Sequence, residues 1–396
     1  MLYKQEDFEP LVDEPWHEGR IRAGIREIVA DTDSALRGPK LLWGADRWDR
    51  WRATSPLKDL YVGAAGVLWA LADLRDRGHA ESTLDLGELA LRVHERHRAR
   101  PDLAAWNDLP EPREASLLSG EAGILLVAYR LAPSRDLAES LLAHVRENVD
   151  NEADELMWGA AGTMIAARWM LGWTGDERWR DAWNASAGAL LARRGRDGLW
   201  TQRLHGYEER YLGPAHGLVG NVLALGQLLD RRRLSSLQRE TNDVLARAAF
   251  VDDGLANWPP APRDVLESPR GEIRLQWCHG APGIVTSATG YLDETLVLGG
   301  AELTWQAGAH RDAKGASICH GNAGNGYGLL AAFARTGDER WLARARRFAV
   351  HALAQTRRLR DARGRGRYSL WTGDLGVALY LAACVDARPA FPVLDA

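Results

Sequence analysis

The sequence predicts an all-α fold, namely an α/α toroid built from seven helical-hairpin repeats. The first observation is a Gly-x-x-Gly element that occurs seven times at spacings of 39 to 63 residues, a length that suits two helices and their loops. The other two are the apolar stretch after each element and the amphipathic segments between elements. The glycine pairs are Gly63/Gly66, Gly120/Gly123, Gly159/Gly162, Gly217/Gly220, Gly280/Gly283, Gly321/Gly324 and Gly373/Gly376.

The apolar stretch after each glycine pair predicts an inner helix. Residues 67–71, 124–128 and 377–381 are apolar nearly all round, as a helix enclosed by other helices should be. Glycines at the start of such helices let them begin abruptly and crowd around an axis, with free N–H groups facing one mouth. We therefore expect seven inner helices whose closure into a ring buries both exposed ends of the array.

Amphipathic segments predict the outer helices. Residues 84–98 and 135–147 keep Leu, Ala and Val at helical spacing opposite Arg, Glu and Asp. The hexapeptide Thr-Gly-Asp-Glu-Arg-Trp occurs at 174–179 and again at 336–341, each time 12 residues after the second glycine of its repeat. Its Asp can cap the outer helix that follows. Alternating β-branched runs, which predict strands, are scarce.

Domain organisation and composition limit the classes of function. We expect one domain over residues 1–396, with a helical preface at 1–56 and repeats from 57 to 384. A net charge of −4 and a pI near 6.3 do not suggest a nucleic-acid partner. The polar N-terminus lacks the core of a secretory signal, and no apolar run reaches membrane-spanning length. Three cysteines, an odd number, indicate a reducing, cytoplasmic setting.

Cysteine and histidine recur at fixed positions before the glycines. Counting back from the first glycine, His216, His279 and His320 occupy position −1, and Cys278 and Cys319 occupy position −2. Because neighbouring repeats lie side by side in a toroid, these groups should converge on one mouth. Thiolate and imidazole are ligands that suit zinc, and two cysteines with one histidine would leave a fourth position open, as in catalytic zinc sites.

Two other interpretations stay open at this point. In the first, both cysteines are buried apolar residues, which is the commonest state of Cys; their shared phase argues against it. Cys384, eight residues beyond Gly376 on an apolar helix, fits that description better. A closed site that uses both His279 and His320 is the second alternative.

Three sequence blocks resemble the signature of the lanthionine synthetase C-like family. They are Gly-Pro-Ala-His-Gly at 213–217, Trp-Cys-His-Gly at 277–280 and Cys-His-Gly at 319–321. The glycine repeats extend the resemblance from about residue 60 to the C-terminus. The resemblance implies an α/α barrel that holds Zn²⁺ and activates a thiol for addition to a dehydroamino acid. The implied zinc ligands are Cys278, Cys319 and His320.

Further residues match the family in finer detail. Arg274 occupies the place of an arginine in the bacterial cyclases, and Lys314 resembles a lysine of the eukaryotic-type, glutathione-using members. The acidic pair Asp154 and Glu155 resembles an element of the eukaryotic-type members; we assign the site to Asp154, with Glu155 as the alternative. His216 is the candidate proton donor, because its usual pKa lies near working pH. Arg274 or Lys314 would balance an enolate or hold a substrate carboxylate.

The leading functional hypothesis is a zinc-dependent enzyme that forms thioethers. A cysteine of a dehydrated precursor peptide would give a lanthionine ring, whereas glutathione would give an adduct on a dehydroamino-acid residue of a damaged protein. A non-catalytic, peptide-binding scaffold with structural zinc is a further alternative. A toroidal glycosidase would need two separated carboxylates, which the adjacent Asp154 and Glu155 do not supply.

Overall fold

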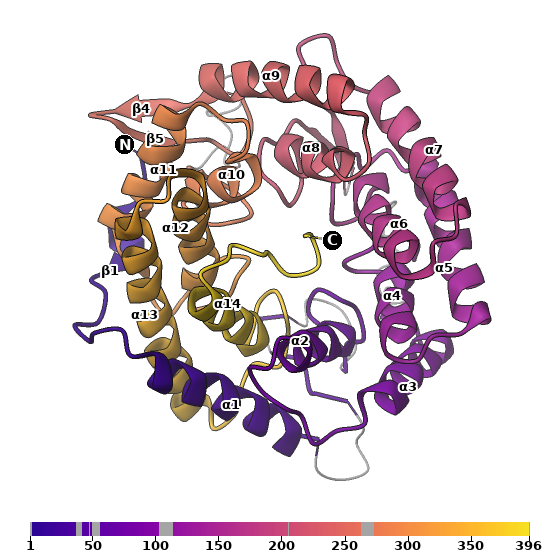
Figure 1. Cartoon of the computed structure of the whole chain (residues 1–396), viewed down its shortest axis with the longest axis horizontal. Helices are drawn as coiled ribbons and strands as arrows, with labels where there is room; N and C mark the ends of the chain where they lie inside the picture. The colour runs from indigo at the N-terminus through magenta and orange to yellow at the C-terminus, as the bar shows by residue number, and fades with distance from the viewer. Residues whose placement is uncertain are drawn as a thin grey trace.

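Two concentric rings of helices make up the molecule (Figure 1). The computed structural model describes residues 2–36, 42–46, 48–49, 56–102, 114–204, 206–262 and 273–395. Within these residues the inner ring has seven helices: α2 (Ala64–Asp76), α4 (Glu121–Leu131), α6 (Ala160–Thr174), α8 (Leu218–Gly226), α10 (Ala281–Ala288), α12 (Asn322–Thr336) and α14 (Asp374–Asp386). The outer ring in the same residues comprises α1 (Glu18–Ser34), α3 (Leu86–Ala99), α5 (Arg135–Glu147), α7 (Arg178–Ala192), α9 (Arg231–Ala248), α11 (Glu294–Ala307) and α13 (Glu339–Arg363).

The inner ring is closed. Each inner helix packs against the next one along the chain, and α14 packs against α2. Helix α1 lies on the outer rim against α13 and α14, and is therefore the outer partner of the last inner helix (Figure 1). The N-terminal preface thus supplies the outer helix that completes the seventh hairpin; its residues 37–41, 47 and 50–55 lie outside the described residues. The predicted all-α toroid is confirmed.

The glycine pairs have two separate structural roles. The first glycine of each pair is the N-cap of its inner helix, as predicted. The second glycine allows close approach of backbone: a Cβ at Gly283 would lie 1.7 Å from the carbonyl oxygen of Trp277. Neighbouring repeats also meet there, because a Cβ at Gly66 would lie 2.8 Å from Cβ of Leu370 in the seventh repeat. Only glycine fits these contacts, which explains the repeat.

The recurring hexapeptide ends an inner helix and begins an outer one. Gly175 and Gly337 are left-handed C-caps of α6 and α12, with φ of 66° and 69°. The side chains of Asp176 and Asp338 then accept the backbone N–H two residues further on. Asp338 is the N-cap of α13, so its predicted capping role is confirmed. Asp176 lies one residue before Glu177, the N-cap of α7, and bonds to the first residue of that helix.

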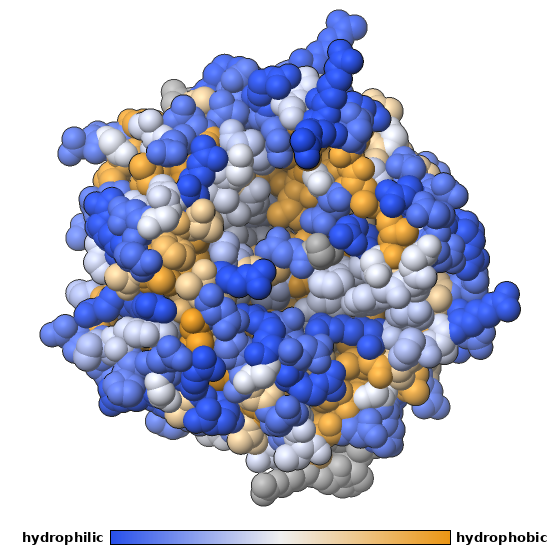
Figure 2. Space-filling model, viewed as in Figure 1, coloured by the Kyte–Doolittle hydropathy of each residue, from blue (hydrophilic) through white to orange (hydrophobic). Residues whose placement is uncertain are grey.

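Besides the helices, the described residues form short antiparallel strand pairs and 3-10 turns. β1 (Phe8–Glu9) pairs with β6 (Ala309–His310), β2 (Gln202–Leu204) with β3 (Tyr207–Glu209), and β4 (Phe250–Asp252) with β5 (Leu255–Asn257). The turns are η1 (Gln5–Asp7) and η3 (Asn148–Asp150). Figure 2 shows hydrophilic residues over most of one face, with apolar residues in separate patches. Among the helices of the described ranges, none combines the length and apolarity that crossing a bilayer requires.

The C-terminal segment fills the centre of the inner ring (Figure 1). Phe391, only 3% exposed, lies with its ring centroid 4.7 Å from those of both Trp277 and Tyr327. Trp169 donates its indole N–H to the carbonyl of Val393 at 2.8 Å. The segment is therefore part of the core, and it packs directly beneath the loop that carries Cys278.

Replacement of Phe391 by alanine is expected to lower the free energy of unfolding by about 3–5 kcal/mol, the usual cost of removing a buried aromatic ring. Urea unfolding followed by circular dichroism measures the change. Val251→Ala is the control, because Val251 is 60% exposed and its loss should change stability by less than about 0.5 kcal/mol. Equal stability of the two variants would show that the C-terminal segment is not part of the core.

Candidate metal centre

A chain of backbone hydrogen bonds brings the position −2 residues of neighbouring repeats together at one mouth of the inner ring. Cys278 donates its N–H to the carbonyl of Cys319 at 3.3 Å, and Cys319 donates to Trp371 at 2.9 Å. Trp371 donates to Tyr61 at 3.1 Å, and Tyr61 donates to Leu118 at 2.8 Å. These bonds run across the closure of the ring. They hold the two cysteines and Tyr61 side by side, although the three residues are far apart in the sequence.

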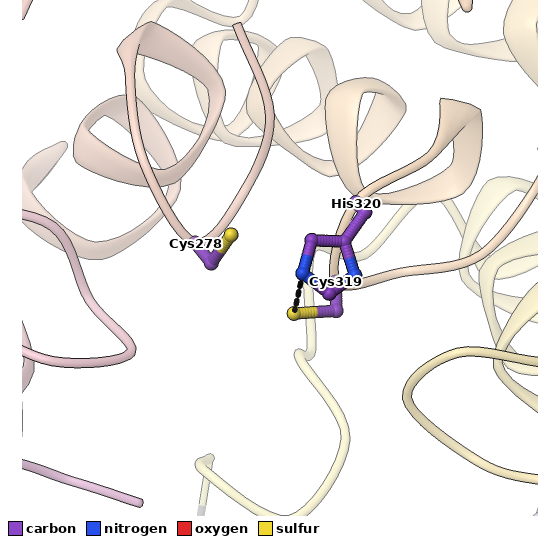
Figure 3. Close-up of side chains that lie close together, drawn as sticks. All are labelled: Cys278, Cys319 and His320. Atoms are coloured by element: carbon purple, nitrogen blue, oxygen red, sulfur yellow. Dashed lines mark hydrogen bonds between the residues drawn. The ribbon is translucent and has the colours of Figure 1, made fainter. Parts of the chain in front are cut away.

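Three side chains gather as the sequence predicts for a metal site. The sulfurs of Cys278 and Cys319 and a ring nitrogen of His320 all lie within 4.8 Å of one another (Figure 3). Sγ of Cys319 is 3.6 Å from Nε2 of His320, and both cysteines are buried. Tetrahedral zinc with Zn–S bonds of about 2.3 Å separates two sulfur ligands by roughly 3.8 Å, so this donor set fits zinc.

The electrostatics of the two thiols differ. Burial opposes ionisation of Cys278, but the Cys319 thiol and the nearby His320 and His279 outweigh it and hold the pKa of Cys278 well below its usual range. Burial and the neighbouring Cys278 raise the pKa of Cys319. The two neighbouring sulfurs therefore have different electrostatic surroundings. Cys384 behaves differently: burial raises its pKa to about 12, as in an apolar core.

Each of the two sulfurs also accepts a hydrogen bond from a buried side chain. The Tyr61 hydroxyl donates to Sγ of Cys319 at 3.1 Å, and Nε2 of Gln276 donates to Sγ of Cys278 at 2.8 Å. Neither residue was predicted from the sequence, although for Tyr61 a signal existed. Tyr61 occupies position −2 of its repeat, the same phase as Cys278 and Cys319.

His216 forms a hydrogen-bonded pair with Glu155. Nδ1 of His216 is 2.9 Å from Oε2 of Glu155, and the carboxylate also accepts the backbone N–H of Met157 at 2.9 Å and of Gly159 at 3.1 Å. Burial lowers the pKa of His216, but the hydrogen bond and charge of Glu155 outweigh it and raise that pKa above its usual value. The His216 side chain is 26% exposed while that of Glu155 is fully buried. His216 is thus the member that a substrate can reach.

Asp154 does not face this pair. Its carboxylate forms an ion pair with Arg193, with Oδ1 2.7 Å from Nη2, and the residue has a φ of 46°. Its carbonyl accepts the side-chain N–H groups of Gln202 and Asn221. Of the two acids, it is thus Glu155, the alternative, that lies against His216, and Asp154 that lies against Arg193. The difference is local: the Glu155 carboxylate accepts backbone N–H groups of the loop just before α6, whereas the Asp154 carboxylate pairs with Arg193.

His279 lies beside the centre and outside the group of three ligand atoms. Its ring stacks on that of His216 at 6.0 Å and lies 5.4 Å from that of Tyr211. Burial lowers the pKa of His279 to about 4, so it is neutral near pH 7. Within the described residues the geometry favours a set of two cysteines and His320 over a closed set with two histidines.

The charges of the two predicted cationic residues act on different members of the site. Arg274 is exposed, and its charge opposes protonation of both His216 and His279. Lys314 is half-buried, and its charge favours the thiolate of Cys319. Lys314 lines a cavity of about 50 Å³ together with Trp48 and Arg367, and the ring of Trp48 lies 5.4 Å from that of His320.

Comparisons with known proteins bear on this arrangement. A model of the lanthionine synthetase C-like protein family matches residues 54–395. Glutathione S-transferase LANCL1 of Danio rerio is 32% identical over 205 residues, which are 48% of this chain and 47% of that protein; the match thus spans about half the length of that relative. The solved structure of nisin cyclase superposes with a TM-score of 0.62 at 16% identity, covering 95% of this chain and 97% of that chain. At that identity the superposition shows a shared fold.

Proposed function

The chain belongs to the lanthionine synthetase C-like protein family, and we propose that it adds a thiol to a dehydroalanine or dehydrobutyrine residue of a peptide or protein, forming a thioether. The observation that carries the proposal is the convergence of Cys278, Cys319 and His320 within 4.8 Å, at the mouth where His216 also lies. When bound there, zinc would supply the Lewis acidity that deprotonates an entering thiol at neutral pH.

The residues around the ligands supply the remaining chemistry. Attack of a thiolate on the β-carbon forms a C–S bond and moves the π electrons onto the carbonyl as an enolate, which then needs a proton at Cα. His216 is placed to give that proton, because Glu155 favours its protonated form and its ring remains partly exposed. Arg274, whose charge already acts on His216, is the candidate to balance the enolate.

The thiol donor has two candidates. The leading one is a cysteine of a dehydrated precursor peptide, in line with the fold shared with nisin cyclase. Glutathione is the second, favoured by the named activity of the Danio rerio relative and by Lys314, a half-buried cation near Cys319 that suits an anionic thiol. Ligand thiols of this kind need reducing conditions, which supports a cytoplasmic location.

We expect the zinc-loaded protein to accelerate thioether formation on a dehydroalanine peptide. One peptide carries an internal cysteine; a matched peptide lacks it and is supplied with glutathione. Mass spectrometry then reports ring closure, as loss of the alkylatable thiol, or the glutathione adduct. Acceleration of only one reaction identifies the thiol donor. If neither reaction exceeds its uncatalysed rate while zinc is bound, the protein is a zinc-containing scaffold.

A further inference from the structure

Both ligand sulfurs are held by dedicated hydrogen-bond donors. Tyr61 and Gln276 are 5% and 2% exposed, so water does not compete for their protons. Tyr61 is fixed by backbone bonds to two neighbouring repeats, and its ring lies 5.9 Å from that of Trp371. Gln276 is fixed by its own backbone N–H, which donates to the carbonyl of His279 at 3.1 Å. Each donor is therefore held by backbone hydrogen bonding as well as by burial.

The proposed reaction suggests a functional role for these two hydrogen-bond donors. A dehydroamino acid that enters the site would meet two ligand thiolates as well as the substrate thiolate, and any thiolate can add to its β-carbon. Addition of a ligand thiolate and addition of the substrate thiolate follow the same course: one C–S bond forms, the π electrons move onto the carbonyl, and one proton is taken up at Cα. Neither addition involves oxidation or reduction. Addition of a ligand sulfur would, however, convert that cysteine into a thioether and destroy the metal site.

We propose that Tyr61 and Gln276 are positioning residues that lower the nucleophilicity of Cys319 and Cys278, so that the substrate thiolate is the sulfur that adds. A hydrogen bond donated to a thiolate withdraws electron density from it, and partners of metal ligands tune the metal site in this way. The Tyr61 hydroxyl can donate only one hydrogen bond, and it donates that bond to the Cys319 sulfur. The inference rests on the proposed function, since only a site that admits an electrophile needs this protection.

Two variants remove the donors with little change of shape. Tyr61→Phe deletes the hydroxyl, and Gln276→Met keeps the length of the side chain without its N–H. Tyr291→Phe is the matched control, because the Tyr291 hydroxyl is buried without a hydrogen-bond partner in the described part of the chain and lies in the turn after α10. Zinc content is measured first in all three variants, so that reactivity is compared in loaded protein.

The main readout uses acrylamide, a simple electrophile, without any substrate thiol. Peptide mass spectrometry reports the rate of alkylation at each cysteine. Tyr61→Phe should raise alkylation of Cys319 roughly tenfold, and Gln276→Met should raise that of Cys278 by a similar factor, as expected for loss of a hydrogen bond to a charged group. In each variant, the alkylation rate of the other of these two cysteines should rise by less. Cys384, buried in α14, reports unfolding, because it is labelled only if the helices open.

A second readout does not depend on reactivity. In cobalt-substituted protein, loss of a hydrogen bond to a sulfur raises the energy of its lone pairs, so the sulfur-to-cobalt charge-transfer band should move to longer wavelength in both variants and stay in place in Tyr291→Phe. Unchanged bands together with wild-type alkylation rates would overturn the inference. This result is distinct from failure of the proposed function, because neither readout requires thioether formation by the enzyme.

Discussion

Replacement of either sulfur ligand, by Cys278→Ala or Cys319→Ala, is expected to remove bound zinc and thioether formation together while the rings of helices stay folded. The side chains of Cys278 and Cys319 provide two of the three donor atoms. Their backbone hydrogen bonds to neighbouring repeats do not involve the sulfur, so alanine keeps them. The core of the toroid is one large apolar cluster drawn from the inner and outer helices, so we expect it to hold the fold without the metal. Elemental analysis should fall from about one zinc per chain to nearly none.

Cys384→Ala is the matched control for that experiment. Cys384 is fully buried on α14, so the variant loses a core sulfur without losing a predicted ligand. It should keep its zinc and its turnover, although it will be somewhat less stable because a small cavity replaces the side chain. Retention of full zinc in both ligand variants, or loss of zinc in the control alone, would refute the assignment of the metal centre.

Loss of the proton donor should have the second largest effect. His216→Ala is expected to slow thioether formation by roughly 10²–10⁴-fold, the usual contribution of a positioned acid or base, with zinc content unchanged. Zinc is retained because His216 is held by Glu155 and is not among the three ligand atoms. Steady-state rates on a dehydroalanine peptide, compared with metal analysis of the same samples, measure both properties.

The pH profile provides an independent check on His216. Because Glu155 raises the pKa of His216 above its usual value of 6.5, the protonated donor persists above that pH, and the native rate should fall only as pH rises through the raised pKa. This decline should be absent from the profile of His216→Ala. His144→Ala, which removes a histidine of the outer helix α5, should keep both the rate and the profile. Loss of zinc from His216→Ala would instead make His216 a ligand.

Short, repeated sequence patterns were enough to predict much of this structure. The glycine pairs predicted seven inner helices, because a Cβ at the second glycine would collide with a carbonyl oxygen, and that constraint leaves a mark in every repeat. The shared phase of Cys278 and Cys319 predicted that they meet, because adjacent repeats place equivalent residues side by side. The segment 135–147 was predicted as an outer helix and is α5.

Neighbouring residues in one loop were harder to separate. Asp154 and Glu155 are adjacent acids of similar chemistry, and which of them meets His216 depends on the direction of each side chain. Glu155 faces the start of α6, where backbone N–H groups and His216 converge on its carboxylate, while the φ of 46° at Asp154 turns that residue toward Arg193. No periodicity in the sequence carries that information.

The sequence by itself determined the repeat, the ring and the phase of the predicted ligands, because each is enforced again in every hairpin. Only the tertiary structure decided the contacts made where the ring closes. Tyr61 reaches Cys319 across 258 residues, α1 becomes the outer partner of α14, and Phe391 fills the centre beneath Trp277. These contacts form once each, between residues distant in sequence, so steric and hydrogen-bonding complementarity in the folded ring specifies them and no local pattern records them.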